Sequence, residues 1–247
     1  MVRSLILFIS FTPLIQKKEA EKKDPPGIFY TTPLIVRPGD KQKLVLRGEK
    51  LDAVKNVTVV GAAGAKARVL SGKKTPLGNN QPRRIGDTEL QIELDLPKGT
   101  KPGATLTASG PGGQSKAYLL LIADGTPAVT EKEPNDGFAA AQKIPLPSAV
   151  EGSIKSDKDV DVYQFEGKKG DTVKIEVEAA RFGSPLDALT TLHDADRKII
   201  AQADDTDGSA DPILTATLPR DGSYFISVID AHDLGGPQFG YRLVVTK

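Results

Sequence analysis

The densest group of side-chain oxygen donors in the chain lies near its middle. In an extended segment successive side chains alternate between two faces, so Glu131, Glu133 and Asn135 share one face. Pro134 favours this geometry, because the residue before a proline is kept out of the helical region. Asp136 adds a fourth donor at the turn that follows. The segment therefore presents four oxygen donors on its own.

A second alternating series of carboxylates follows at Asp157, Asp159 and Asp161. If the two series meet in space, they offer the roughly 6–8 oxygen ligands that Ca²⁺ prefers, with no nitrogen or sulfur to attract zinc. Carboxylates packed in this way repel one another unless a cation lies among them. The alternative is a pair of solvated acidic turns that bind no ion.

The rest of the chain must position these donors, and its composition indicates how. The length of 247 residues suffices for two domains, each with its own core. The 24 glycines and 18 prolines suit many turns between short strands. The chain has no cysteine, which excludes disulfides, thiolate metal sites and cysteine nucleophiles.

The net charge of +1 conceals two halves of opposite sign. Residues 1–130 hold 20 Lys and Arg against 11 Asp and Glu, whereas residues 131–247 hold 13 against 21. The balance therefore changes from +9 to −8 at the acidic segment. The acidic half favours cation binding, and the basic half either contacts an acidic surface or pairs with its neighbour.

The N-terminus has the pattern of an export signal. Arg3 precedes an apolar run over residues 4–15 that is too short for a comfortable membrane span. No small-residue cleavage site follows it, so an uncleaved anchor and a mis-set start codon remain alternatives. Residues 16–26 form a charged spacer that ends in two prolines. We expect a secreted, periplasmic or cell-surface protein, with no membrane span beyond this segment.

Residues 27–124 have the pattern of a first β-sandwich. Residues 91–96 alternate strictly between polar and apolar, as in a strand with one wet face. The predicted strands cover residues 27–31, 34–37, 42–47, 56–60, 67–71, 89–96, 104–109 and 115–122. Two series of residues resemble the bacterial immunoglobulin-like TIG/IPT modules. The first has the spacing Gly-x4-Leu-x-Leu-x-Gly-x2-Leu and consists of Gly39, Leu44, Leu46, Gly48 and Leu51. The second lies later in the chain and consists of Pro97, Gly103, Thr105, Gly113 and Ser115. Such modules usually serve as spacers or interaction platforms.

A polar insertion at residues 73–86 contains Arg83 and Arg84. No aromatic side chain lies near them in sequence to stack on bases, so we expect a solvated loop and no nucleic-acid partner.

Residues 125–247 have the pattern of a second β-sandwich, entered through a short linker at residues 123–130 and the acidic linker at residues 130–137. Residues 138–143 are expected to form one helical turn or a loop. The predicted strands cover residues 160–166, 172–179, 189–193, 199–203, 213–218, 222–229 and 241–246.

Motifs of this second half resemble the bacterial pre-peptidase C-terminal (PPC) domain over roughly residues 129–247. They are Glu133-Pro134-Asn135-Asp136, Gly152-x-Ile154, Asp159-x-Asp161-x-Tyr163-x-Phe165, Gly170-Asp171, Ser184-x2-Asp187, Leu192-x-Asp194-x-Asp196, Ala203-Asp204-Asp205, Leu218-Pro219-x-Asp221-Gly222-x-Tyr224 and Gly240-Tyr241-x-Leu243. The resemblance implies a jelly-roll-like sandwich, often appended to secreted peptidases and akin to the calcium-dependent collagen-binding domains of clostridial collagenases. It implies a Ca²⁺ site made by Glu131, Glu133, Asn135, Asp136, Ser153, Asp157, Asp159 and Asp161.

Two features limit what this resemblance carries over. Collagen-binding relatives display aromatic side chains, whereas this chain has five Tyr and no Trp and places Ile226 and Val228 on the late strand. Collagen binding is therefore not expected. A second acidic group, Asp204, Asp205, Asp207 and Asp211, lacks the terminal Glu of an EF-hand and is interpreted as an ordinary turn.

The sequence does not indicate an enzyme. Its two histidines, His193 and His232, are interpreted as surface residues, and no nucleophile elbow, zinc-protease helix or phosphate-binding loop occurs. We expect a non-catalytic exported two-module accessory protein that presents a surface to an extracellular protein or polysaccharide. The alternatives are a structural subunit of a cell-envelope assembly and an unrecognised hydrolase. The sequence leaves the partner's identity and the oligomeric state open.

Overall fold

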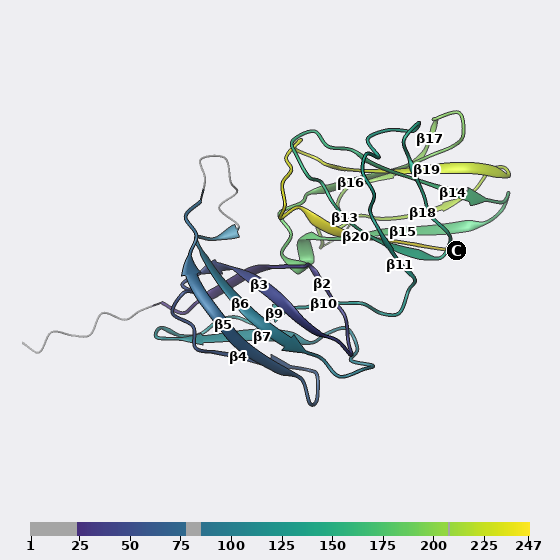
Figure 1. Cartoon of the computed structure of the whole chain (residues 1–247). Helices are drawn as coiled ribbons and strands as arrows, with labels where there is room; N and C mark the ends of the chain where they lie inside the picture. Colours follow the sequence, from purple (N-terminus) through teal and green to yellow (C-terminus); the bar gives the residue numbers. More distant parts are fainter. Residues whose placement is uncertain (1–23, 78–84, 207) are drawn as a thin grey trace, which may run out of the picture.

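The computed structural model describes residues 24–77, 85–206 and 208–247, and this part of the chain is all-β with two β-sandwiches in tandem, as predicted (Figure 1). The proposed signal segment, Arg83, Arg84 and Asp207 lie outside the described residues. The domain limits given above stay predictions. Among the described residues, no helix has the length and apolar character needed to cross a membrane.

The N-terminal sandwich faces one four-stranded sheet with another. In the first sheet the order is β1 (Gly27–Thr32), β3 (Lys41–Glu49), β6 (Thr88–Asp95) and β5 (Lys66–Lys74). In the second, β4 (Asn56–Val60) pairs with β7 (Thr105–Gly110), which also pairs with β8 (Gly113–Gln114) and β9 (Tyr118–Leu119). A short parallel pair joins β2 (Ile35–Val36) to β10 (Leu121–Ile122).

The alternation predicted for residues 91–96 is confirmed by the burial of the side chains along β6. Leu90, Ile92 and Leu94 of β6 are fully buried in the N-terminal core, while Gln91 and Glu93 face outward. Leu106 and Ala108 of β7 in the opposite sheet belong to the same core cluster, so they cover the apolar face of β6.

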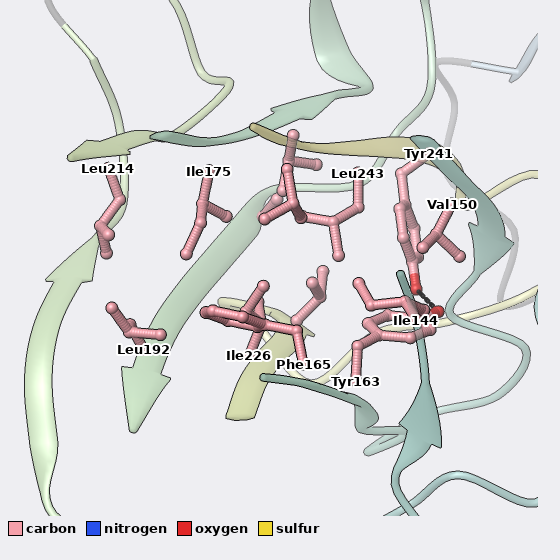
Figure 2. Packing of buried hydrophobic residues seen from close by; sticks show 14 of the residues in the cluster. Ile144, Val150, Tyr163, Phe165, Ile175, Leu192, Leu214, Ile226, Tyr241 and Leu243 are labelled. Carbon is pink, nitrogen blue, oxygen red and sulfur yellow. Dashed lines mark hydrogen bonds between the residues drawn. The ribbon is translucent and has the colours of Figure 1, made fainter. Parts of the chain in front are cut away.

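The C-terminal sandwich consists of two five-stranded sheets. One has the order β11 (Ala128–Thr130), β13 (Ser148–Ser153), β20 (Gly240–Thr246), β15 (Thr172–Glu178) and β18 (Ile213–Thr217). The other has the order β12 (Gln142–Lys143), β14 (Asp161–Gly167), β19 (Gly222–Asp230), β16 (Ala188–His193) and β17 (Ile199–Ala203). Side chains from both sheets interdigitate in one core, where Ile175 and Leu243 lie opposite Phe165 and Ile226 (Figure 2).

The sequence missed three strands of this sandwich. Ser148–Ser153 forms β13, which pairs with β20 along six residues, and the expected linker contains β11, which pairs with β13 in parallel. The expected turn or loop at residues 138–143 ends in β12. The sequence SAVEGS of β13 lacks the run of branched and aromatic residues that marks a strand, so its pairing depends on its neighbours.

One inference from the late strand was wrong. Ile226 and Val228 are fully buried in the core, so they do not occupy the positions where an exposed aromatic residue would stand. Side chains alternate along β19, and Phe225 lies on the opposite, outer face. The outer face of this sheet therefore does carry an aromatic ring.

The two sandwiches contact each other through a small apolar cluster and several polar bonds. Ile35 and Leu121 of the first pack against Phe182 of the second, which lies in the 3₁₀ turn η2 (Ala180–Phe182). The Tyr118 hydroxyl donates to the carbonyl oxygen of Phe182. Gly183 follows with φ +87°, and a Cβ at this position would lie 1.9 Å from the carbonyl oxygen of Phe29. Only glycine allows this close approach.

Candidate metal centre

Glu131 is held at the end of a strand with its side chain turned inward. Its backbone N–H donates to the carbonyl oxygen of Glu151 at 3.1 Å, which extends the β11–β13 pairing by one residue. Its side chain is only 5% exposed, and its Oε2 atom accepts the backbone N–H of Ser153 at 3.2 Å. The carboxylate is therefore fixed by the sheet that carries it.

Asp161 approaches Glu131 from the other sheet. It is the first residue of β14 and shares the core-facing side of that strand with Tyr163 and Phe165, because strand side chains repeat every two residues. Asp161 is fully buried, and its Oδ2 atom accepts a hydrogen bond from the Tyr241 hydroxyl at 2.5 Å. The carboxylate thus lies at one end of the core.

Two tyrosine hydroxyls join the sheets beside these carboxylates. The hydroxyls of Tyr163 and Tyr241 lie 2.6 Å apart (Figure 2). The Tyr163 hydroxyl also donates to Glu131 Oε1 at 3.2 Å. Tyr163 belongs to β14 and Tyr241 to β20, so this network crosses the sandwich.

Glu133 completes a cluster of three carboxylates. One carboxylate oxygen from each of Glu131, Glu133 and Asp161 lies within 4.8 Å of the other two. The linker is held there because the N–H of Val162 donates to the carbonyl oxygen of Asn135 at 3.0 Å. The two acidic series therefore meet in space.

The carboxamide of Asn135 is fully buried and points into the cluster. Its oxygen faces only acceptors, namely carboxylate oxygens of Asp161 and Glu133. If the amide is turned over, its nitrogen donates to Asp161 Oδ1 at 3.2 Å and Glu133 Oε2 at 2.6 Å. With the oxygen inward, the carboxamide would instead add a fourth oxygen-bearing group to the three carboxylates. That donor set fits a hard divalent cation.

The close approach of these acidic groups raises the pKa values of several side chains in the cluster. Burial, followed by the charge of Glu131, raises the pKa of Asp161 to about 9. The hydrogen bond from Tyr241 opposes this rise. Burial and the neighbouring carboxylates also raise the pKa values of Tyr163 and Tyr241, so both hydroxyls stay protonated as donors.

The other residues of the predicted set lie around this cluster. Asp136 and Asp159 contact each other, and desolvation followed by this contact raises the pKa of Asp136. Asp159 also accepts the backbone N–H groups of Lys155 and Val160, at 2.6 and 3.0 Å.

Neither of the last two predicted ligands, Ser153 and Asp157, has a side-chain bond to the carboxylate cluster in the described residues. Ser153 contributes its backbone N–H to Glu131. Asp157 is exposed and accepts the backbone N–H of Gly235 at 3.2 Å.

Sequence reasoning missed Lys155, whose ammonium lies at the cluster. Its Nζ atom is 2.9 Å from Glu133 Oε1 and 3.1 Å from Glu131 Oε2. Desolvation acts to lower the pKa of Lys155, but the hydrogen bonds to Glu133 and Glu131 outweigh it and the pKa is raised. No spacing rule would have singled out this lysine among its neighbours. The roles of Tyr163 and Tyr241 could have been found from their alternation with core residues.

A second group of acidic side chains forms away from this site. Asp187, Asp204 and Asp205 bring one carboxylate oxygen each within 4.8 Å of one another. Asp211 is fully buried instead and accepts the N–H groups of Ala179 and Ala180 at 3.1 and 2.6 Å. Asp211 therefore fixes the entry to η2.

Comparison with known proteins defines the class of the second sandwich. Residues 159–229 match the family described as the bacterial pre-peptidase C-terminal domain. The expected resemblance is thereby confirmed for these residues, which include Asp159, Asp161 and Tyr163. It stays a prediction for the acidic linker, as does the immunoglobulin-like resemblance of residues 30–124.

Individual relatives cover parts of the chain. A probable subtilase-type serine protease of Deinococcus radiodurans is 38% identical over 99 residues, which span 39% of this chain and 14% of that protein. The pre-peptidase C-terminal domain of a Bacillus anthracis collagenase is 18% identical, with a TM-score of 0.36 over 47% of this chain and 100% of that one. SGBP-B of a Bacteroides ovatus mixed-linkage glucan utilization locus, solved with a heptasaccharide, is 10% identical, with a TM-score of 0.27 over 83% of this chain and 74% of that one.

We predict that the stability of the metal-free protein falls as the pH rises from 5 to 8. Asp161 binds a proton up to about pH 9 when folded but only up to about pH 4 when unfolded, so the folded state loses its advantage across this window. Asp161→Asn should flatten the dependence of the melting temperature on pH in a chelating buffer. Asp171→Asn is the control, because the bond with Lys247 lowers the pKa of Asp171 and moves its effect to acid pH. Equal slopes for all three proteins would contradict the assignment.

Proposed function

We propose that this chain is a non-catalytic, exported accessory protein whose second sandwich binds Ca²⁺ and presents a surface to an extracellular protein or polysaccharide. The observation that carries the proposal is the convergence of Glu131, Glu133 and Asp161 at one end of a PPC-type sandwich. The immunoglobulin-like first sandwich acts as a spacer or platform in this proposal.

The ion would be held by Glu131, Glu133, Asn135 and Asp161. Bidentate carboxylates and water would complete the coordination, because Ca²⁺ takes 6–8 oxygens. Bound Ca²⁺ would offset the negative charge of these carboxylates. Glu131 belongs to one sheet and Asp161 to the other, so occupancy would tie both sheets and the acidic linker together.

The outer face of the sheet containing β14, β19 and β16 offers the contact surface. Phe138 packs edge-on against His193 and Phe225, with ring centroids 5.1 and 5.3 Å apart. The Arg197 guanidinium lies 5.4 Å from the Phe138 centroid. Gln164 Nε2 donates to the Ser223 hydroxyl on neighbouring strands, so amide and hydroxyl groups are available on the adjoining strands. Rings beside such groups suit the contact of sugars or peptides.

Thermal melts with Ca²⁺ and with chelator test the metal site. Binding to the folded state alone stabilises it by about 2.7 kcal/mol when the ion is at a hundred times its Kd, a shift of several degrees. We expect Glu133→Ala and Asp161→Ala to abolish the shift, since each removes a charged donor. Asp196→Ala is the control, because its exposed carboxylate pairs with Arg220. A wild-type protein that melts at the same temperature in both buffers would rule out the site.

Co-sedimentation tests the proposed surface. Wild-type protein should sediment with at least one member of a panel of insoluble polysaccharides and fibrous proteins, and Phe138→Ala should reduce binding about tenfold or more by removing the central ring. Leu234→Ala is the control, because this side chain is 47% exposed in a different loop. Retention of full binding by Phe138→Ala would exclude this face. Calcium-dependent self-association without binding to the panel would favour the structural-subunit alternative, and hydrolysis of a panel member would revive the hydrolase.

A further inference from the structure

Lys155 bridges two carboxylates of the cluster from the loop that follows β13. Its ammonium is within hydrogen-bonding distance of both Glu131 and Glu133, while its backbone N–H is held by Asp159. The loop is therefore anchored to the acidic cluster at both the backbone and the side chain. Ordinary surface ion pairs contribute about 0–1 kcal/mol. This one differs because the Glu131 side chain is only 5% exposed, so removing its counter-charge leaves a buried anion.

Lys155 contacts two of the three carboxylates that a metal ion would use. Glu131 Oε2 and Glu133 Oε1 face the ammonium, and Glu131 and Glu133 are also two of the three carboxylates that approach within 4.8 Å. One ammonium and one divalent cation cannot both make close contacts with these two carboxylates without strong repulsion. Occupancy by one therefore works against the other.

We propose that Lys155 is a tethered cation that exchanges with Ca²⁺ at this site. The inference rests on the proposed calcium site and adds how its affinity is set. Without the metal, the ammonium neutralises Glu131 and Glu133 and keeps the acidic linker in place. With the metal, the side chain swings out to solvent, which its 50% exposure and four-carbon stem allow. The lysine stabilises the metal-free fold and weakens the affinity for Ca²⁺.

This exchange suits a protein that meets calcium only outside the cell. Extracellular calcium modules commonly bind with Kd values of about 10⁻⁴–10⁻³ M, and affinity is tuned by the charge of the donor set. A built-in competing charge lowers affinity without removing a ligand. It also leaves the apo protein with a paired, folded site before it encounters the ion.

Calcium titration calorimetry on Lys155→Met tests the exchange. Methionine keeps the apolar stem but removes the charge, so the affinity for Ca²⁺ should rise about tenfold or more at low salt. In chelator the same variant should melt at a lower temperature than wild type, which widens the gap between the two buffers. Lys155→Arg keeps the charge and should bind Ca²⁺ within about threefold of wild type.

Lys132→Met is the matched control. Lys132 is an exposed lysine between Glu131 and Glu133 in sequence, and no ion pair of its side chain occurs within residues 24–77, 85–206 and 208–247. Lys132→Met removes the same charge from a position next to both glutamates in sequence, so it reports any general electrostatic effect. We expect less than a threefold change in affinity.

The outcomes separate the two proposals. If wild-type protein shows no calcium binding, the proposed function fails. If wild type binds but Lys155→Met binds no more tightly than Lys132→Met, the exchange is refuted while the metal site stands. If Lys155→Met is unfolded even in excess Ca²⁺, the lysine is a structural pair and the exchange is likewise refuted.

Discussion

The fold of the second sandwich brings three carboxylates close together, and the sandwich is stable only if their mutual repulsion is offset. Glu131 ends a strand of one sheet, Asp161 begins a strand of the other, and Glu133 lies on the linker between them. Like charges at such distances in a partly buried site destabilise the fold unless protons or cations intervene. The side chains around the cluster reduce this repulsion. The tyrosine pair donates hydrogen bonds, Asn135 offers either end of its amide, and Lys155 supplies a positive charge.

Under the proposed exchange, the same residues would balance their charge in two ways, without and with calcium. In the metal-free protein the raised pKa of Asp161 favours its protonated form at neutral pH, and the ammonium of Lys155 pairs with Glu131 and Glu133. In the proposed calcium-bound state, the ion would replace both the proton of Asp161 and the ammonium of Lys155, so positive charge would still face the carboxylates. The two sandwiches contact each other through Phe182 and Tyr118, and Glu131 and Lys155 line a pocket together with Pro33 and Leu34 of the first sandwich.

Local rules predicted the class of fold from the amino-acid sequence, whereas the approach of the two acidic series was conditional and was expected from the family resemblance. Alternation in β6 and β14 indicates which side chains face the core, and glycine and proline mark the turns between strands. The sequence did not predict β11 and β13, since their strand character comes from pairing with β20 and with each other. The interpretation of the late strand was also wrong, because the alternation of side chains places Phe225 outward and Ile226 inward.

The sequence did not indicate the role of Lys155, because its contact with two acidic side chains depends on how the loop after β13 folds back onto the linker. The sequence also does not indicate that Asp161 joins the cluster whereas Asp157 accepts the N–H of Gly235, because both contacts depend on the folded loops.

The central claim is that the linker and the start of β14 share one divalent ion. A crystal structure of the intact chain grown in calcium, with an anomalous difference map collected where calcium scatters, tests it most directly. The account predicts one strong peak bounded by oxygens of Glu131, Glu133, Asn135 and Asp161, with the Lys155 ammonium turned away from it. A map with no peak there and with Lys155 still bonded to both glutamates in excess calcium would contradict it.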